Sequence, residues 1–484
     1  MEGARVATDR GWVRGHRRQD GAAFLGIPFA AAPVGPLRWR PPQRAPGWTG
    51  TRDALVFGPD APQAPQATLR GPRQDEDCLY LNVWTPTLDS GARLPVLVWV
   101  YGGGFVYGSG SDPGCDGSTL AAEGAVVVTF NYRLGLLGYL AHPALSAESP
   151  REVSGNYGLQ DQLAALAWVR DNIASFGGDP ARITPFGVSA GAASLSLMLG
   201  SPQAQGLFQR TILHSPGAGR PLASLRQAEE AGLRLVTDLA ALRALPAREV
   251  LARNAMLMPA VRGLTTPRVL RPIRDGWLLP QQERAVLEQR RQRPMPLLVG
   301  TNLDEGTQLT RGWPIDSLAA WRQQVDANFG PWAADAAGVY AARSDADARA
   351  AVAAMFADTQ FNHGARLLAR AMASVEPRTY KYLFTRRRPD QADGPHHSDE
   401  TSHAFGTLHT LPAFDAVDEA LSRRMRKAWV AFAAHADPNI DGLPRWEPYR
   451  LADDNHLVLD GEPQPGAGWR QGPLDFLERF YASS

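Results

Sequence analysis

One five-residue segment carries the pattern of a serine nucleophile. Gly187-Val188-Ser189-Ala190-Gly191 is the single G-x-S-x-G of the chain, and it lies between a predicted strand that ends near Phe186 and a predicted helix that begins at Ser189. A serine in so sharp a strand-to-helix turn is pushed out at the helix N-terminus, and the turn needs glycines beside it. The pattern also arises by chance, as a tight glycine turn with a surface serine. Its position between a strand and a helix favours a nucleophile.

A second glycine cluster, Gly102-Gly103-Gly104, follows the apolar segment Leu94–Tyr101. Attack on a carbonyl creates negative charge on its oxygen, and preorganised N–H groups must meet that charge. Three successive glycines allow the backbone to approach a ligand closely and to present such groups. A phosphate-binding loop fits less well, because no Gly-Lys-Ser/Thr follows. A flexible turn is the other alternative, and the serine motif makes it the weaker one.

The segments that must position these residues alternate between strand and helix patterns. Continuous apolar, β-branched runs predict strands covered on both faces. Strands are predicted at Leu94–Tyr101, Ala125–Phe130, Arg182–Phe186, Arg210–Leu213, Met295–Val299 and Thr379–Phe384. Helices are predicted between Gly158 and Phe176 and from Ser189 to Leu199, the first stopped by Gly177-Gly178. This alternation predicts an α/β fold with a mainly parallel central sheet flanked by helices.

Two helical blocks interrupt the alternation, approximately 222–293 and 310–375, both rich in Ala, Leu and Arg. They are either extra helical layers or a cap over the carboxyl ends of the strands, where α/β sheets place their sites. The two interpretations are compatible. A length of 484 residues suggests about three domains as a prior. The order of the motifs instead predicts one catalytic domain over residues 1–484, with the two blocks as helical cap insertions.

The charge balance excludes some functions. Lys and Arg number 50 against 49 Asp and Glu, which leaves a formal net charge of +1. A basic footprint for nucleic acid is therefore missing, and no long-range attraction favours an ionic substrate. The two cysteines, Cys78 and Cys115, cannot form a four-thiolate zinc site and suggest a reducing compartment. His403 and His409 have no third partner at a ligand spacing, so we expect no metal and no cofactor.

The N-terminal region carries arginines but no apolar run behind a basic start, so it does not resemble a signal peptide. The apolar strings are far too short to span a bilayer. We expect a cytoplasmic protein, unless a leader has been removed, with no membrane span and no nucleic-acid partner. The oligomeric state is open, and a monomer is favoured.

The chain resembles the type-B carboxylesterases, an α/β-hydrolase family that includes bacterial para-nitrobenzyl-type esterases, cholinesterases and neuroligins. The pattern is closest to the bacterial para-nitrobenzyl-type enzymes. The matches run in order along nearly the whole chain and comprise Phe24–Ala30, Pro33–Gly35, Leu37–Trp39, Glu76–Trp84, Tyr101–Phe105, Asn131–Gly135, Gly155–Gly158, Phe176–Pro180, the serine motif and Asp437–Asn439. So many ordered matches are specific, whereas a single motif is not.

The resemblance implies a Ser-Glu-His triad. Ser189 matches the nucleophile, and Glu305 matches the acid of the family's Asp-Glu-Gly turn after a strand. The family's histidine precedes the Gly of a Phe-Gly pair by nine residues, which gives His397. The order Ser, acid, His is that of α/β-hydrolases. The resemblance also implies that the backbone N–H groups of Gly103, Gly104 and Ala190 form the oxyanion hole. His396 and Asp304 are the adjacent competitors for two of these roles.

Departures from the family bear on rate and pH dependence. Val188 stands where the family usually has Glu, so we expect a drier pocket that is less favourable to cations. Glu400 matches another acid behind the triad and is expected to lack an indirect partner. His214-Ser215-Pro216-Gly217 replaces the family's Gln-Ser-Gly-Ser, so the second serine, a usual support for the triad, is absent. Cys78 has no upstream cysteine to pair with, and the choline-stacking aromatic is missing, which disfavours cholinesterase activity.

The resemblance therefore predicts a serine carboxylesterase that acts on a small-molecule ester through an acyl-enzyme. A hydrolase of amides, carbamates or thioesters would use the same triad and stays open. A non-catalytic, neuroligin-like binding protein is disfavoured, because Ser189, Glu305 and His397 are all present. Esters of moderate length without charge are the expected substrates, since Val188 favours an apolar pocket floor.

Overall fold

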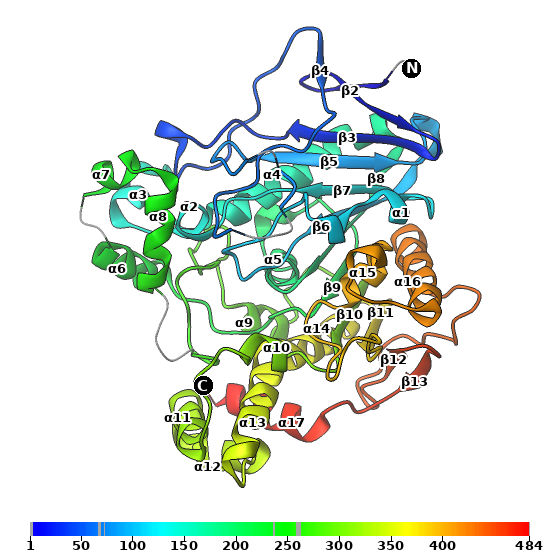
Figure 1. The fold of residues 1–484 in the computed structure, drawn as a ribbon. Coiled ribbons are helices and arrows are strands. Elements are labelled where there is room, and N and C mark those ends of the chain that lie inside the picture. The colour runs from blue at the N-terminus through cyan, green and yellow to red at the C-terminus, as the bar shows by residue number, and fades with distance from the viewer. Residues whose placement is uncertain (1–2, 66–68, 72, 236–237, 258–262, 484) are drawn as a thin grey trace.

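The computed structural model describes residues 3–65, 69–71, 73–235, 238–257 and 263–483. Across these residues, thirteen strands form one sheet in the order β1-β2-β3-β5-β7-β6-β8-β9-β10-β11-β12-β13, with β4 paired to β2 (Figure 1). The strands are β1 Ala4–Thr8, β2 Gly11–Arg18, β3 Gly21–Pro28, β4 Thr51–Asp53, β5 Tyr80–Thr85, β6 Leu94–Val100, β7 Val126–Phe130, β8 Gly178–Val188, β9 Thr211–His214, β10 Leu297–Asn302, β11 Thr379–Phe384, β12 His456–Leu459 and β13 Gln464–Gly466.

The central part of this sheet is parallel, as predicted. Each neighbouring pair from β7 through β6, β8, β9, β10 and β11 to β12 is parallel. The N-terminal strands β1, β2, β3 and β5 add an antiparallel edge that joins the parallel part at β7. The six predicted strands are all present, with ends that differ by a few residues. The sheet is thus mixed, with a parallel centre.

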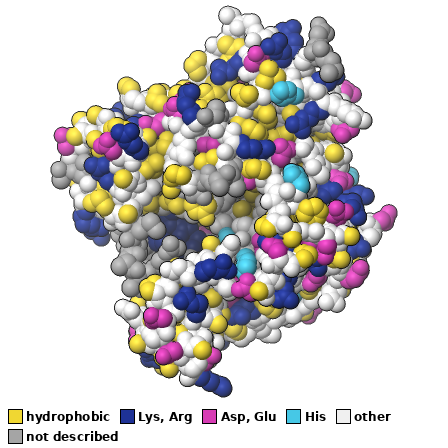
Figure 2. Space-filling model, in the orientation of Figure 1, with side chains coloured by type: hydrophobic (Ala, Val, Ile, Leu, Met, Phe, Trp, Pro, Cys, Tyr) yellow, Lys and Arg dark blue, Asp and Glu magenta, His cyan; other side chains and the backbone are white. Residues whose placement is uncertain are grey.

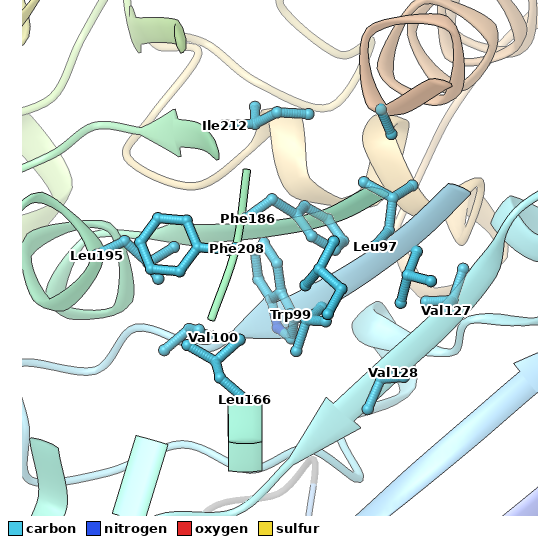
Figure 3. Close-up of a cluster of buried hydrophobic side chains, with 14 of the residues drawn as sticks. Leu97, Trp99, Val100, Val127, Val128, Leu166, Phe186, Leu195, Phe208 and Ile212 are labelled. Carbon is cyan, nitrogen blue, oxygen red and sulfur yellow. The ribbon is translucent and has the colours of Figure 1, made fainter. Parts of the chain in front are cut away.

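The main hydrophobic core covers both faces of the parallel strands. Figure 3 shows side chains of β6, β7, β8 and β9 meeting Leu166 and Leu195, which come from two helices. Trp99 packs edge-on against Phe405 and close to Phe186. All of these side chains are buried. Continuous apolar strands are therefore buried because helices cover both sides, as the sequence pattern indicated.

The helices are α1 Ser118–Ala121, α2 Gly135–Tyr139, α3 Pro143–Glu148, α4 Tyr157–Asn172, α5 Ala190–Met198, α6 Leu225–Leu235, α7 Leu239–Ala244, α8 Ala247–Ala252, α9 Glu283–Glu288, α10 Thr307–Thr310, α11 Leu318–Phe329, α12 Ala333–Val339, α13 Asp345–Ala357, α14 His363–Ala373, α15 Glu400–Phe405, α16 Ala416–His435 and α17 Gln471–Ala482. A π-helical turn, η8 Asp358–Asn362, links α13 to α14. The two predicted helices correspond to α4, which a 3-10 turn extends to Phe176, and to α5.

The two blocks that interrupt the alternation are helical. The first, 222–293, holds α6 to α9, and residues 236–237 and 258–262 within it lie outside the described residues. The second, 310–375, holds α11 to α14 and has its own core, which includes Trp321, Val325 and Phe329. The C-terminal helix α17 adds Phe476 and Phe480 to that core. Helix α17 contacts α12, η8 and α14, and lies in this part of the molecule in Figure 1.

Candidate active site

Ser189 occupies a strained turn between a strand and a helix. Strand β8 ends at Val188, and α5 begins at Ala190. Ser189 itself has φ 57° and ψ −119°, a conformation that costs a non-glycine residue of order 1–3 kcal/mol and that clusters at active sites. Its backbone N–H donates to the His214 carbonyl at 3.0 Å, and its carbonyl accepts from Ala193 N–H at 2.8 Å. The turn is therefore held from both sides.

Gly191 explains the last glycine of the motif. A Cβ added there would lie 2.0 Å from the Val100 carbonyl oxygen and 2.7 Å from that of Tyr101. These contacts are far shorter than van der Waals distances, so only glycine permits helix α5 to approach the end of β6. The same approach brings Ser189 beside the second glycine cluster, because a Cβ on Gly102 would lie 3.0 Å from the Ser189 Cβ.

Glu305 and His397 are in direct contact. The Nδ1 atom of His397 lies 2.5 Å from Oε2 of Glu305. The other carboxylate oxygen, Oε1, accepts hydrogen bonds from the Ser215 hydroxyl at 2.5 Å and the Asn302 N–H at 2.7 Å. Glu305 is buried. A buried carboxylate is stable when donors surround it, and these donors fix both of its oxygens.

The second ring nitrogen of His397, Nε2, is buried and has no hydrogen-bond partner among the described residues. The imidazole stacks on the Phe361 ring, with centroids 4.2 Å apart and planes 26° from parallel. Phe361 belongs to the π-helical turn η8. Contact with Glu305 on one side and Phe361 on its face orients the ring and leaves Nε2 available. The described residues record no hydrogen bond between Ser189 and His397, and such bonds often tighten only when substrate is bound.

The glycines after β6 form a tight loop beside Ser189. Gly103 has φ 99°, and a Cβ there would lie 2.0 Å from the Tyr107 carbonyl oxygen. Within the described residues, neither the Gly103 nor the Gly104 amide donates a hydrogen bond. Phe105, which follows directly, packs in a small buried cluster with Ala190 and Ala193 of α5. The loop and the start of α5 are therefore packed together, as an oxyanion hole made from Gly103, Gly104 and Ala190 requires.

The competing residues point elsewhere. His396 Nε2 lies 2.9 Å from Asp393, and its backbone N–H donates to Asp399. Asp304 accepts backbone N–H bonds within its own turn, from Gly306 and Thr307. Neither residue takes part in the contact between Glu305 and His397. His403 lies 3.2 Å from Asp418, and no group of three metal-ligating side chains occurs in the described part of the chain.

Two residues that support this site were not assigned a role from the sequence. The Ser215 hydroxyl donates to Glu305, so the first serine of the His-Ser-Pro-Gly segment supports this carboxylate although the second serine is missing. His214 lies 3.2 Å from the Glu400 carboxylate, and the Trp429 indole N–H donates to its Nε2. Indole is only a donor, so His214 accepts there and carries its proton on Nδ1. The chain therefore gives Glu400 a histidine partner behind the triad.

Glu400 is buried and also accepts from the Asn302 side-chain amide. Burial by itself pushes the pKa of this carboxyl up, but the contacts with His214 and Asn302 outweigh burial and hold the pKa below its ordinary value. A negative charge therefore persists behind the triad even though Val188 replaces the family's Glu, and Val188 itself is buried.

Comparison with known proteins decides the family. A model described as the carboxylesterase family matches residues 2–476. The chain belongs to the carboxylesterase family. Among curated relatives of this carboxylesterase, a fumonisin B1 esterase of Sphingopyxis macrogoltabida is 45% identical over 443 residues, covering 88% of this chain and 81% of that protein. A phenmedipham hydrolase of Pseudarthrobacter oxydans is 35% identical and covers 91% of both.

Solved structures agree with the family assignment. A PNB esterase structure superposes on this carboxylesterase with a TM-score of 0.86 at 32% sequence identity, covering 97% of this chain and 99% of that one. The resemblance to para-nitrobenzyl-type esterases and the α/β-hydrolase fold are thus confirmed. The chain is a carboxylic-ester hydrolase of the serine type. Among the described helices, none has the length and apolarity needed to cross a membrane.

Proposed function

We propose that Ser189, His397 and Glu305 are the catalytic triad of this carboxylesterase. The observation that carries the proposal is the 2.5 Å contact between His397 Nδ1 and Glu305, which leaves a buried and unpartnered Nε2 on the same ring. A serine hydroxyl is a weak nucleophile near neutral pH and needs a base such as this nitrogen. The strained turn that presents Ser189 supports the same assignment.

The reaction proceeds in two halves. His397 Nε2 takes the hydroxyl proton while Ser189 Oγ attacks the ester carbonyl, and the same nitrogen then gives that proton to the leaving alcohol. Water next attacks the acyl-enzyme, again with His397 as base, and releases the acid. Glu305 holds the ring tautomer and stabilises the imidazolium that forms in each half. The N–H groups of Gly103, Gly104 and Ala190 meet the negative charge on the carbonyl oxygen.

We propose that the two helical blocks form the cap of a single catalytic domain. Phe361 of the second block stacks on His397. Asn254 of the first block accepts a hydrogen bond from the Leu136 N–H. The residue before Leu136, Gly135, donates to the Phe105 carbonyl. A contact from each block near the proposed triad supports the cap assignment. We therefore expect side chains of these blocks to contact the substrate and to influence which esters are hydrolysed.

We also propose a monomer in a reducing, cytoplasmic compartment of a bacterium. Cys78 and Cys115 are both free and buried, and burial raises the pKa of each thiol well above its ordinary value. Thiols of this kind stay protonated and unreactive. The bacterial origin of the relatives named above is in keeping with this proposal.

The test is hydrolysis of p-nitrophenyl esters of rising acyl length by the wild-type protein and by Ser189→Ala. We expect the variant to lose activity by at least about a thousandfold, while its melting temperature stays near that of the wild type. Ser194→Ala is the control, because Ser194 is a buried serine of α5, the helix that follows Ser189, and lies outside the proposed triad. Equal hydrolysis by wild type and Ser189→Ala would show that the assignment is wrong.

A further inference from the structure

Three arginines from the first helical block and the segment before it gather near the triad. Arg220 and Arg268 both donate to the side-chain oxygen of Gln360, Arg268 at 3.1 Å. The guanidinium of Arg271 lies over the Phe105 ring, 5.4 Å from its centroid. Arg271 follows Arg268 by three residues; burial lowers its pKa, and the positive charges of Arg220 and Arg268 lower it further. The three residues therefore form one cluster, here called the arginine cluster.

The arginine cluster borders the catalytic residues on several sides. Gln360, which holds two of the arginines, precedes Phe361, the residue that stacks on His397. Phe105, beneath Arg271, directly follows the glycines of the oxyanion loop. Arg220 Nε donates to the Gly217 carbonyl at 2.9 Å, two residues beyond the serine that bonds Glu305. The arginines therefore contact Gln360, Phe105 and Gly217, which are close along the chain to Phe361, to the proposed oxyanion loop and to Ser215.

The three arginines are packed among protein atoms and are still reached by solvent. Burial is the main cause that lowers the pKa of Arg220, to about 10, and that of Arg271. Figure 2 shows a hollow near the middle of the viewed face, with dark-blue Lys or Arg side chains inside it.

In the described part of the chain, little negative charge offsets Arg220 and Arg271. Among the described residues, Arg271 forms no ion pair and no hydrogen bond with a carboxylate, and Arg220 has no carboxylate within ion-pair distance. Glu283 is the nearest acid that acts on both. It accepts the Gly219 N–H at 2.7 Å, and burial raises its own pKa. The guanidinium groups remain charged at neutral pH, so the positive charges of Arg220 and Arg271 repel one another in a partly desolvated place.

An anion bound at the cluster would relieve this repulsion. The planar guanidinium matches a carboxylate and can bind it through two parallel hydrogen bonds, and desolvated pairs of this kind are strong. We propose that the arginine cluster binds a free carboxylate of the substrate, so that the preferred substrates are esters which carry a carboxylate a few bonds from the scissile group. This inference rests on the proposed function of Ser189. It departs from the uncharged esters expected from the sequence.

The test compares anionic and neutral esters of matched length. Ethanol release from monoethyl glutarate is measured against release from ethyl pentanoate, which places the charge on the acyl side. Acetate release from 4-acetoxybutanoate is measured against release from butyl acetate, which places it on the alcohol side. We expect kcat/KM to favour the anionic member of at least one pair, and the better pair identifies the side on which the carboxylate binds.

Substitutions in the cluster show whether the arginines cause the preference. Arg271→Gln and Arg220→Gln are each expected to lower the anionic-to-neutral ratio of kcat/KM by about tenfold or more. Arg271→Lys, which keeps the charge, should restore part of the ratio, and a merely structural role would not give that rescue. Arg234→Gln is the control, because Arg234 is an exposed arginine of α6, and it should leave the ratio unchanged.

Binding separates this inference from the proposed function. Titration of glutarate into Ser189→Ala by calorimetry should give heat that is lost in Ser189→Ala/Arg271→Gln. Ser189-dependent hydrolysis of neutral esters with no anionic preference would overturn the inference and leave the triad intact. Glutarate binding that depends on the arginines, together with hydrolysis that does not depend on Ser189, would support the inference and overturn the proposed triad. Absence of both the preference and the binding overturns the inference whatever the activity.

Discussion

At the scale of single residues, the Glu305 carboxylate is the most tightly defined group of the site. It is buried and is surrounded by the Ser215 hydroxyl, the Asn302 N–H and the His397 ring. Each of these groups can donate a hydrogen bond, and the carboxylate accepts all three. Its position in turn fixes which nitrogen of His397 faces the nucleophile, because the ring must turn Nδ1 toward it.

Substitution of the two adjacent histidines should therefore have unequal effects. We expect His397→Ala to lower kcat by at least about a thousandfold, because the general base is removed. His396→Ala should change kcat only slightly, since His396 contacts Asp393 and the Asp399 region rather than Glu305. Steady-state hydrolysis of p-nitrophenyl butyrate measures both. A severe loss in His396→Ala with activity retained in His397→Ala would reverse the assignment.

Ser215→Ala removes one donor from the buried Glu305 oxygen. A hydrogen bond to a charged group contributes about 1.5–3 kcal/mol, so we expect kcat/KM to fall by about tenfold to a hundredfold, with a shift of the acid limb of the pH–rate profile. Ser201→Ala is the control, because its hydroxyl bonds the Leu278 carbonyl at 2.7 Å in a buried place away from Glu305. If both variants lose equal activity, Ser215 acts through stability alone.

Sequence reasoning proposed the triad residues from family spacing, as with His397 before the Phe-Gly pair, and the structure brings Glu305 and His397 into contact. It did not assign a role to Ser215. The family's second serine is replaced by Gly217, and nothing in the local sequence tells which hydroxyl reaches Glu305. That contact joins residues 90 positions apart. The same holds for His214 and Glu400, which meet only after β9 and α15 are packed.

At the scale of elements, the turn between β8 and α5 depends on close backbone contact. Gly191→Ala should prevent that contact, because the new Cβ would lie 2.0 Å from the Val100 carbonyl oxygen. We expect loss of activity and a melting temperature lowered by several degrees or no folded protein at all. Gly338→Ala, in helix α12 with nothing within 4 Å of an added Cβ, should be neutral or stabilise by up to about 1 kcal/mol.

Thermal unfolding followed by circular dichroism distinguishes these two variants. The prediction fails if Gly191→Ala melts and hydrolyses esters like the wild type. A destabilised Gly338→Ala would mean that glycine substitution in general, rather than the contact with Val100, accounts for the loss.

The parallel strands could be predicted because they are continuous apolar runs that two helical layers bury. The antiparallel edge was not, because β2 reads Gly-Trp-Val-Arg-Gly-His-Arg-Arg and has only two buried residues. Strands β12 and β13 are short and also gave no signal. The association of α17 with the second helical block needed tertiary information as well, since the two are separated by several strands and helices.

At the scale of the whole molecule, one buried histidine links three helices and makes stability depend on pH. His363 of α14 stacks near Tyr481 of α17 and lies 3.5 Å from Arg284 of α9. Burial lowers its pKa well below the ordinary value, and the charges of Arg284 and Arg366 add to the effect. The folded protein therefore keeps this ring neutral at a pH at which the unfolded chain binds a proton.

The free energy of unfolding should accordingly fall as pH drops below about 6.5, with this residue contributing up to about 1.4 kcal/mol per pH unit. Above that pH neither state protonates the ring, and the contribution vanishes. In urea unfolding, the free energy of unfolding of His363→Gln should fall less steeply as pH drops, by the slope that corresponds to one proton. His435→Gln, at an exposed position of α16, should keep the wild-type slope. An unchanged slope in His363→Gln would contradict the prediction.

Strand β9 is only four residues long, yet it connects the nucleophile to the acid. The His214 carbonyl at its end receives the Ser189 N–H, and the next residue, Ser215, bonds Glu305. The histidine comes from a different loop, after β11, but that loop is bonded to the same turn. The Asp304 N–H donates to the Pro395 carbonyl at 3.1 Å, and the Asn302 side-chain amide donates to the His396 carbonyl at 2.6 Å. One short strand and two loop-to-loop hydrogen bonds therefore register Ser189, Glu305 and His397 against one another.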